Sequence, residues 1–593
     1  MITVCFWLSV TILLGSTVYS QILSAQKKYG GTLNPTSVLF VGVLVASFVL
    51  YFPAYFQQEA GDPFQVLKTF LFTANTAMDT FGGGGDYGLI KDTIDGDLQY
   101  AYSLLAALLM LLAPVLTLAV VMSFFSNILA TFRYILAYFR DVYIFTELNE
   151  QSLTLAKDLF DQDNNRALVF TDVPVSDDSA EKLRNQAKKL GAILFPKDAL
   201  SIRFHIHDVA KSIYFFAMGQ DESANLEHAL RLVRAYGNRE NTHLYVLSTD
   251  TEGEVLLTSS GHRAMKVRRV DPVQSLIYRN LHDRGQVLFD HARPGEDGVK
   301  NISAVVIGMG KHGTAMMKAL TWYCQMDGYR VRIDGFDRDN SAEDRFCAQC
   351  PELMDPRYNG VYVDGEAQYY IRIHGGVNTD TKTFTDRIHS LDDATYVLVA
   401  LGDDRQNIQT ALRLRMLFEQ CGAKPVIQAI VMSSDKRRAL KDLKNYRGQP
   451  YHIDFIGDLE SSYTQDVIIN SELEKEALRR HLRWGDEAEF WSYEYNYRSS
   501  MALAVHARAK LQCGMPGADK TEEELRTLLQ ERDRLEKLEH RRWNAYMRSE
   551  GYIYSGSPDK SSRNDLGKMH HDLVNFEDLT EEEKRKDSQV GSA

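Results

Sequence analysis

The residues best suited to bind a charged ligand form a glycine-rich turn near the middle of the chain. Residues 302–307, ISAVVI, read as a buried strand, and GMGKHG at 308–313 follows directly and opens a helix. Glycines at this spacing permit a tight turn and a close approach of phosphate to the backbone, while a helix N-terminus attracts anions. We predict a nucleotide-binding turn with the site residues Gly308, Gly310, Lys311, His312 and Gly313.

Four more residues belong to this predicted nucleotide site. The next strand, 329–336, ends at Asp337, where a carboxylate usually binds ribose hydroxyls, although Asp337 lies further downstream than the usual ~20 residues. Arg338 follows it, and Gly402 and Asp404 lie in a later strand-to-helix turn. The same glycines also serve helix–strand packing, so the pattern predicts the fold more strongly than a bound ligand.

An internal repeat sets the architecture around this site. Residues 214–232, YFFAMGQDESANLEHALRL, match residues 396–414, YVLVALGDDRQNIQTALRL, with Asp221 opposite Asp404 and Asn225 opposite Asn407. Each copy reads as a strand, a polar turn and an amphipathic helix, which predicts two α/β lobes at 141–300 and 301–450. The first lobe has TELNE at 146–150 in place of the glycine turn. Its side chains would crowd a pyrophosphate, so we expect a structural or coupling role for that lobe.

Three apolar runs precede the lobes, at 2–19, 38–56 and 102–129. Each approaches or exceeds the ~20 residues that a helix needs to cross a membrane. The first could instead be a signal peptide, but no basic residue precedes it. Lys27 and Lys28 follow the first run, and Arg133 and Arg140 follow the third. Basic residues mark the cytoplasmic side, so we expect the lobes in the cytoplasm and residues 57–101 outside.

The outer segment contains a candidate ion path. Residues 62–80 could form a re-entrant half-helix, and FGGGGDYG follows at 81–88. Glycines let backbone carbonyls line a narrow path, and irregular backbone at membrane depth is tolerated there. A flexible extracellular loop is the alternative. The predicted pore and filter residues are Thr80, Phe81, Gly82, Gly83, Gly84, Gly85, Asp86 and Tyr87.

The order of helix, half-helix, glycine loop and helix resembles the pore unit of the potassium-channel superfamily. GGGGD is closer to the glycine-plus-acid filter of calcium-release channels, so we expect general cation permeation. Two tandem Rossmann-like lobes after a pore unit resemble the RCK (TrkA-N-like) region of ligand-gated channels, over roughly 140–450. That resemblance implies a ring of lobes whose diameter changes with ligand and pulls on the inner helices. Residues 139–141 would join pore and first strand directly.

The C-terminal part resembles the bacterial form of the RyR repeat. Its motifs are EHRRW at 539–543, GYIYSG at 551–556 and HHDLV at 570–574. The sequence departs from the family at His571, where proline is usual, and at Tyr552, where tryptophan is usual. The resemblance implies a helical connector at 451–523, an RyR-like domain at 524–593 and a nucleotide-derived messenger, in an antiviral setting. Aromatic faces could stack a base, although they could equally be core, and the predicted pocket residues are Glu539, Arg542, Trp543, Tyr552, Tyr554 and Lys584.

Composition narrows the function classes. The net charge of −12 argues against a nucleic-acid partner. Six scattered cysteines indicate a reducing cytoplasm, and a lone CxxC at 347–350 makes a weak metal or redox motif, so we predict no metal site. No stretch shows a catalytic arrangement, and we predict that the chain is not an enzyme.

The expected fold class is therefore a membrane α-helical pore unit (1–140) plus α/β: two tandem Rossmann-like (RCK) lobes and a mostly helical RyR-like C-terminal domain. The expected function is a subunit of a ligand-gated cation channel in the cell (inner) membrane. We expect a homotetramer, because three helices and one loop cannot enclose a path alone. The ligand would be NAD-like, ATP/ADP or a nucleotide-derived messenger. The alternatives are a non-conducting membrane-anchored nucleotide receptor and a membrane-tethered NAD-dependent oxidoreductase.

Overall fold

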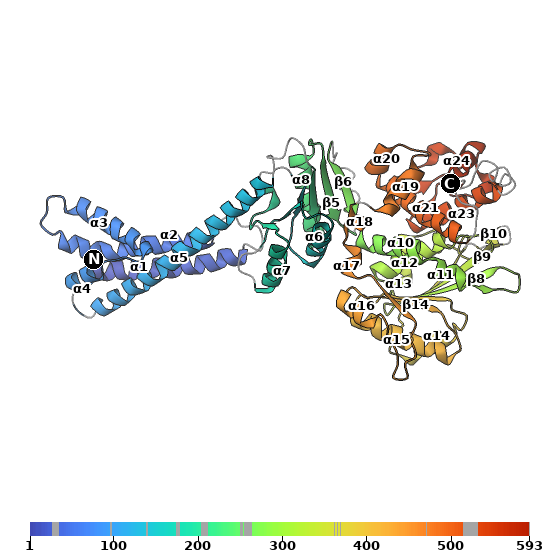
Figure 1. The fold of residues 1–593 in the computed structure, drawn as a ribbon, viewed down its shortest axis with the longest axis horizontal. Helices are drawn as coiled ribbons and strands as arrows, with labels where there is room; N and C mark the ends of the chain where they lie inside the picture. Colours follow the sequence, from blue (N-terminus) through green and yellow to red (C-terminus); the bar gives the residue numbers. More distant parts are fainter. Residues whose placement is uncertain are drawn as a thin grey trace. The chain divides into compact units, whose positions relative to one another are not determined.

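The computed structural model divides the chain into two compact units, Met1–Leu136 and Ala137–Ala593 (Figure 1). The structure describes residues 1–593 except 27–34, 95, 97, 138–139, 174–177, 203–211, 250–252, 254–263, 361, 364–365, 368, 470, 514–531 and 592–593. Lys27 and Lys28, on which the predicted orientation partly depends, lie outside the described residues.

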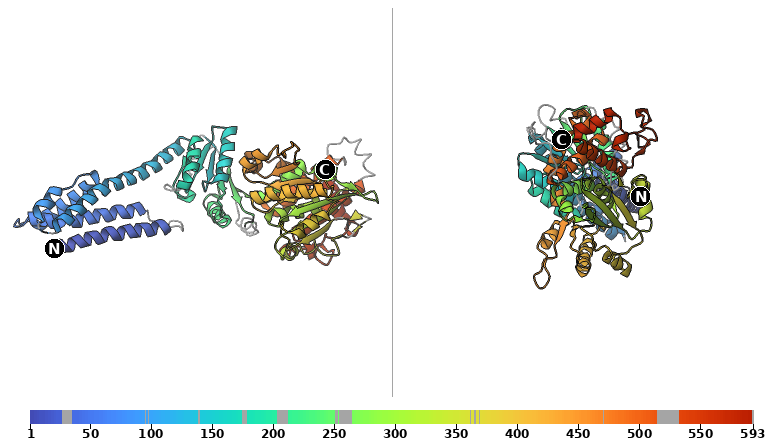
Figure 2. Two further views of the ribbon diagram at one scale, coloured as in Figure 1. Left: turned by 90° about the horizontal axis from the view of Figure 1, so that it is seen from below. Right: turned by 90° about the vertical axis from the view of Figure 1, so that its right-hand side faces the viewer.

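The first unit is helical. Its elements are α1 (Ile2–Gln26), α2 (Pro35–Gln58), α3 (Gln65–Asp79), α4 (Tyr87–Thr93) and α5 (Leu98–Leu136). Three of these helices are long and apolar enough to cross a membrane, at Ile2–Ile22, Ser37–Gln58 and Leu98–Leu118. This confirms three candidate membrane helices. Within the unit α2 packs against both α1 and α5 (Figure 2).

Small residues bring α1 and α2 together. A Cβ at Gly42 would overlap the Ser16 side chain, so only glycine fits there. The Ser9 hydroxyl donates a hydrogen bond of 2.8 Å to the Ala46 carbonyl of the facing helix. Close approach at small residues and hydrogen bonds between helices are the usual means by which helices associate in lipid, where the hydrophobic effect is absent.

Helix α3 has the reverse of the usual amphipathic pattern. Its buried side consists of Thr69, Thr73, Thr76 and Ala77. Large apolar side chains point outward instead: Val66, Leu67, Phe70, Leu71, Phe72 and Met78 are all exposed. A water-facing helix would place these residues inward, because exposed apolar patches of this kind are unfavourable in water. At ~1.5 Å per residue the 15-residue helix is about 22 Å long, less than the ~30 Å hydrocarbon core.

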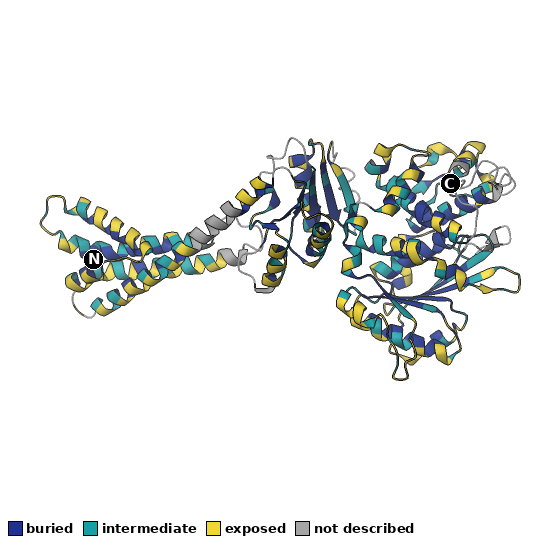
Figure 3. Ribbon diagram, viewed as in Figure 1, coloured by how far each residue is buried: buried dark blue, intermediate teal, exposed yellow. Residues whose placement is uncertain are grey.

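The second unit contains two parallel sheets of the same topology. The first has the order β3-β2-β1-β4-β5-β6. Its strands are β1 (Val142–Phe145), β2 (Ala167–Phe170), β3 (Ile193–Leu194), β4 (Ile213–Ala217), β5 (Thr242–Leu247) and β6 (Lys266–Val270). Among the described residues, strands of this sheet are connected by α6 (Glu150–Gln162), α7 (Asp178–Lys189) and α8 (Glu222–Tyr236). Strands β1 and β2 are buried at every residue, as expected in a parallel sheet covered on both faces (Figure 3).

The second sheet has the order β12-β9-β8-β13-β14-β15, with β7 (Arg293–Pro294) antiparallel to β8. Its strands are β8 (Lys300–Ile307), β9 (Tyr329–Phe336), β12 (Tyr370–His374), β13 (Tyr396–Val399), β14 (Val426–Ile430) and β15 (Ile453–Ile456). Both sheets have the doubly wound order 3-2-1-4-5-6, with the crevice between the first and fourth strands in chain order. Because β15 follows residue 450, the sheet continues past the predicted end of the lobe.

Helices of the second lobe are α12 (Lys311–Tyr323), α13 (Ala342–Gln349), α14 (Lys382–His389), α15 (Asp404–Gln420) and α16 (Ser434–Leu440). Between the sheets lie α10 (Pro272–Arg284) and α11 (Gln286–Asp290). Although α10 follows the first sheet in sequence, Ile277, Tyr278 and Leu281 belong to the core cluster of the second lobe. The second lobe therefore includes part of the connection.

The C-terminal region is built onto α12. Its elements are α17 (Leu459–Ser462), α18 (Gln465–Ile468), α19 (Glu472–His481), α20 (Glu487–Ser492), α21 (Glu494–Gln512), α23 (Arg532–Ser549), β16 (Ile553–Tyr554), β17 (Met569–His570) and α24 (Glu581–Gly591). Side chains of α21 and α23, such as Val505, Leu538 and Tyr546, share one core with Met316 and Trp322 of α12. A movement of α12 would therefore act directly on the packing of the C-terminal region.

Candidate functional site

The three glycines of the turn between β8 and α12 have different structural roles. Gly308 has φ +91°, in the left-handed region that favours glycine. At Gly313 a Cβ would overlap the Gly308 carbonyl oxygen and lie 2.9 Å from its carbonyl carbon, so glycine is needed for helix–strand packing. At Gly310 φ is −72°, and a Cβ would meet nothing within 4 Å. The chain itself does not require glycine at 310, whereas an approaching phosphate would.

The start of α12 is suited to an anion. Its N-cap residue is Gly310, which has no side chain to cap the first amides. Those amides and the helix dipole together favour negative charge. Lys311 and His312 begin the helix, and burial together with the Lys311 charge lowers the pKa of His312. His312 is therefore neutral at pH 7.

A cleft of about 1310 Å³ opens in front of this turn, at the crevice between β8 and β13. It brings together seven of the nine predicted residues: Gly308, Gly310, Lys311, His312, Asp337, Arg338 and Gly402. Arg345, Arg405 and Arg413, which no sequence motif indicated, also line it. Among the described residues, Arg338 and Arg405 are exposed and form no ion pair, so two guanidinium groups are available to a phosphate.

Asp337 supports the turn itself. One carboxylate oxygen accepts a hydrogen bond of 2.7 Å from the Met309 amide, and the other accepts one of 2.8 Å from the Asp339 amide. Each oxygen has a second lone pair, so these bonds are compatible with a ribose hydroxyl as a further partner. Asp337 therefore positions the glycine turn in addition to the recognition role predicted for it.

Asp404 does not line the cleft, which corrects the prediction. Its carboxylate accepts hydrogen bonds from the Met432 and Ser433 amides, at 2.8 and 3.1 Å, at the end of β14. The N-cap of α15 is Asp403 instead. Gly313 also lies outside the cleft lining, because its role is packing.

The two lobes repeat one structural device. In the second lobe the side chain of Asn407 accepts a hydrogen bond from the Leu401 backbone amide at 2.6 Å and donates one to the Ile430 carbonyl at 2.8 Å. In the first lobe Asn225 accepts from the Gly219 amide at 2.6 Å and donates to the Leu247 carbonyl at 3.1 Å. The matched asparagines thus tie the turn to the next strand in both copies. The helix caps, Asp221 and Asp403, show that the one-residue gap of the repeat lies before the cap.

The corresponding turn of the first lobe is filled by its own side chains. Asn149 caps α6 and forms a capping box with Ser152. Its side-chain amide also donates a hydrogen bond of 2.7 Å to the Met218 carbonyl. The carboxylate of Glu147 occupies the space beside Gly219. This matches the prediction that the first lobe's turn leaves no room for a pyrophosphate.

The glycine loop of the first unit lies between α3 and α4. Thr80–Gly82 forms a short 3-10 turn, and Gly83 and Gly85 have φ of +82° and +152°. A Cβ at Gly85 would also lie 2.9 Å from Met110. Glycine is thus needed at two of the four positions. All four glycines are exposed in the single chain, while Phe81 packs on Phe40 with ring centroids 4.4 Å apart.

Side chains of α2 and α5 hold this loop. The Thr117 hydroxyl donates to the Phe81 carbonyl at 3.1 Å. Asp86 caps α4 by accepting from the Leu89 amide at 2.8 Å, and Tyr55 donates to its other oxygen at 3.5 Å. The predicted filter residues are therefore adjacent and anchored, and Asp86 has a local structural role.

Another cavity, of about 510 Å³, lies in the C-terminal region. Three of the residues predicted for a ligand pocket line it: Glu539, Arg542 and Trp543. Tyr552, Tyr554 and Lys584 do not, which corrects the prediction for these three: Tyr552 packs in the core, the Tyr554 amide bonds Glu352, and Lys584 pairs with Glu581. Residues that the analysis missed include Trp484, Tyr495, Lys560, Arg563 and Lys586.

Glu539 and Arg542 form a buried ion network. Glu539 lies 2.8 Å from Arg542 and 3.3 Å from Lys510, and all three are almost fully buried. Burial by itself would raise the pKa of Glu539, but the Arg542 and Lys510 charges lower it to about 2. The Glu539–Arg542 pair is thus a structural element of the cavity wall.

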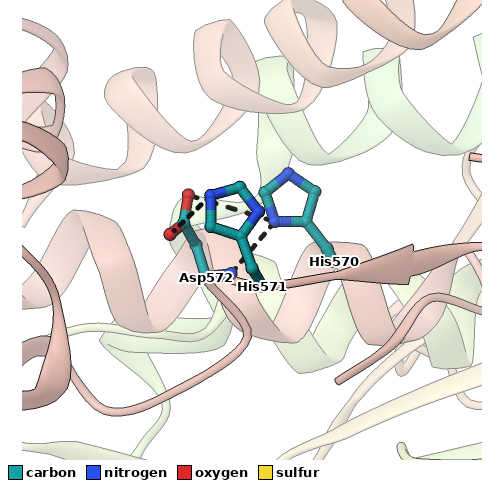
Figure 4. A group of neighbouring side chains, drawn as sticks. All are labelled: His570, His571 and Asp572. Carbon is teal, nitrogen blue, oxygen red and sulfur yellow. Dashed lines mark hydrogen bonds and ion pairs between the residues drawn. The ribbon is translucent and has the colours of Figure 1, made fainter. Parts of the chain in front are cut away.

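His570, His571 and Asp572 could offer three ligands to a metal ion in this cavity (Figure 4). The two rings stack at 4.8 Å, and His571 Nε2 lies 3.2 Å from Asp572. Burial and the nearby Arg563 and Lys586 charges lower the pKa of His570 to about 3. The same positive charges oppose a further cation, so the surroundings do not favour a metal.

Neither a protein-family model nor a curated protein matches this chain.

Proposed function

We propose that the chain is a subunit of a ligand-gated cation channel, opened or closed by a nucleotide-like ligand at the second lobe. The observation that carries the proposal is the exposed glycine loop between α3 and α4. Helix α3 is short and has an apolar outer face, and side chains of α2 and α5, which are long enough to cross a membrane, anchor the loop. Backbone of this kind is tolerated at membrane depth where it lines water or contacts protein.

The cleft supports a nucleotide as the ligand. Gly310 leaves open space above an uncapped helix N-terminus, and Arg338 and Arg405 line the same cleft without ion-pair partners among the described residues. A phosphate would receive backbone amides and guanidinium groups together. The cleft also lies at the topological crevice where doubly wound sheets bind ligands.

A homotetramer would account for the surface of α3. One chain has three candidate spans and one loop, too few to enclose an aqueous path. Phe70, Leu71 and Met78 would then contact lipid or the next copy rather than water. In this arrangement, the lobes would lie in the cytoplasm of a cell-membrane protein, and the ligand would act only through its different affinities for the open and closed states.

The test is a flux assay on purified protein in lipid vesicles or planar bilayers. We expect nucleotide-dependent cation currents, and Asp86→Asn should change conductance or selectivity because it removes a charge beside the loop. The matched control is Asp92→Asn, at an exposed carboxylate on α4. Absence of current from tetrameric protein across adenine nucleotides and dinucleotides would refute the channel.

A non-conducting membrane receptor for nucleotides is the second candidate. It is favoured because polar groups of the loop already have hydrogen-bond partners within the chain. Asp86 caps α4, and the Phe81 carbonyl accepts a hydrogen bond from Thr117. In that case nucleotide binding would persist without currents, and Asp86→Asn would act only on the stability of α4.

A further inference from the structure

A second cavity adjoins the nucleotide cleft and is formed by three parts of the second unit. It has a volume of about 720 Å³ and is lined by the segment 269–278 of β6 and α10, by one face of α12 and by the C-terminal region. Met309, Gly310, Lys311 and Arg345 line both cavities, so the two meet at the start of α12. We call this cavity the basic chamber, after Arg269, Lys311, Lys318, Arg345, Arg498 and Lys568.

The charge of the chamber is unbalanced. Among the described residues that line it, two are carboxylates, Asp271 and Glu550. Asp271 caps α10 by accepting from the Val273 and Gln274 amides, and Glu550 pairs with Arg498 at 3.0 Å. Arg269 pairs with Glu494 at 2.8 Å. Lys311 pairs with Glu222 and Arg345 pairs with Asp339. Four of the six basic side chains thus have carboxylate partners, and the excess positive charge is that of Lys318 and Lys568.

Two lysines of the chamber have no counter-charge in the part of the chain that the structure describes. Among the described residues, neither Lys318 nor Lys568 forms an ion pair, and Lys568 donates only to the Glu550 carbonyl, at 2.9 Å. Lys318 lies two helical turns after Lys311, about 10 Å along α12. A long lysine side chain can cover much of that distance, so the Lys318 ammonium lies within reach of an anion entering past Gly310, and Lys568 lines the same cavity.

Lys311 connects the glycine turn to the first lobe. Its ammonium lies 3.2 Å from Glu222, the first residue of α8, and also bonds the Thr249 hydroxyl. Glu222 in turn accepts from the Thr249 amide at 2.6 Å. A phosphate at the start of α12 would compete with Glu222 for Lys311, so occupation of the site would weaken a contact between the lobes.

We propose that the basic chamber binds the outer phosphates of a nucleoside polyphosphate whose first phosphate lies at the glycine turn, with Lys318 and Lys568 as the phosphate-binding residues. This inference rests on the proposed nucleotide cleft. The chamber selects nucleotides by phosphate number, and its occupation draws Lys311 away from Glu222. The ligand class is therefore a nucleoside di- or triphosphate rather than a monophosphate.

The experiment is isothermal titration of full-length protein in detergent with AMP, ADP and ATP. Affinity should rise with phosphate number in the wild type, with ATP binding at least about tenfold more tightly than AMP. The double variant Lys318→Gln/Lys568→Gln should lose this gain while AMP affinity stays within about twofold. The control is Lys382→Gln, an exposed lysine of α14 outside both cavities.

Equal affinities for AMP and ATP, or a gain that survives the double variant, would refute the chamber and leave the cleft intact. Failure of all three nucleotides to bind the wild type would refute the adenine-nucleotide cleft and with it the chamber. Should the double variant not fold, the single variant Lys568→Gln, at an exposed side chain, gives the same comparison.

Discussion

Alanine should have different effects at Gly310 and at Gly313. At Gly310 it should weaken ligand binding with little change in stability, whereas at Gly313 it should destabilise the protein. A Cβ at Gly310 meets nothing within 4 Å and φ is −72°, so Gly310→Ala should change the free energy of unfolding by at most about 1 kcal/mol. At Gly313 a Cβ overlaps the Gly308 carbonyl. Since β8 and α12 would have to separate, Gly313→Ala should destabilise the protein by about 1–3 kcal/mol or more.

The effect on binding follows from the same geometry. A methyl group at 310 would hold a phosphate away from the turn and remove a charge-assisted hydrogen bond worth about 1.5–3 kcal/mol. Affinity for ATP should therefore fall roughly tenfold to a hundredfold in Gly310→Ala, although the protein stays as stable as wild type. Thermal unfolding and isothermal titration of the two variants measure both quantities. A Gly310→Ala variant that binds all nucleotides normally, or one that unfolds as easily as Gly313→Ala, would refute the assignment of these glycines.

Three other outcomes are expected. Glu539→Gln should cost about 3–5 kcal/mol at pH 7, because it leaves the buried Arg542 charge uncompensated, whereas Glu581→Gln at an exposed carboxylate should cost nearly nothing. The pKa of Glu539 is about 2 in the folded state against an ordinary value of 4.5, so its stabilisation is complete above about pH 4.5 and falls away toward pH 2; the Gln variant should lose that dependence in acid unfolding curves. Asn407→Ala removes the side-chain partner of the half-buried Leu401 amide and of the buried Ile430 carbonyl, and should cost about 2–4 kcal/mol by thermal unfolding. Thr117→Val removes the donor to the Phe81 carbonyl and should change single-channel conductance without changing nucleotide affinity, and an unchanged conductance would contradict the role given to the loop.

Most of the fold could be predicted from local sequence patterns. The three apolar runs became helices long enough to span a membrane, because length and hydropathy alone decide that property. The repeated segment around Asn225 and Asn407 became two sheets of the same order, since strand, turn and helix recur at matched positions. The glycine turn at 308–313 could be predicted from the spacing of its glycines. Gly308 and Gly313 are required by backbone conformation and packing, and Gly310 leaves open space for a ligand.

Long-range features could not be found in the same way. Asp403 and Asp404 are adjacent acids, and the sequence does not show which one caps α15. Arg345 and Arg413 reach the cleft from helices far along the chain. The shared core of α12 and α23 joins residues more than two hundred positions apart, which no local pattern encodes.

Tyr552 and Tyr554 illustrate the limit for the C-terminal cavity. Their motif predicted a stacking surface, but Tyr552 packs on Tyr495 in the core, and Tyr554 lies in β16, where its own backbone amide donates a hydrogen bond to Glu352. An aromatic residue in a motif has the same sequence signature whether it lines a cavity or fills a core. The cavity is lined instead by Trp484, in the turn between α19 and α20, and by Trp543 of α23.

Single-channel recording of the purified chain in planar bilayers, with ATP added on the side of the lobes, tests the central claim most directly. Cation currents whose open probability depends on ATP in the wild type, and becomes insensitive to the same ATP concentration in Gly310→Ala, are the predicted result. A protein that binds ATP through this turn and never conducts would contradict the account of the glycine loop as an ion path.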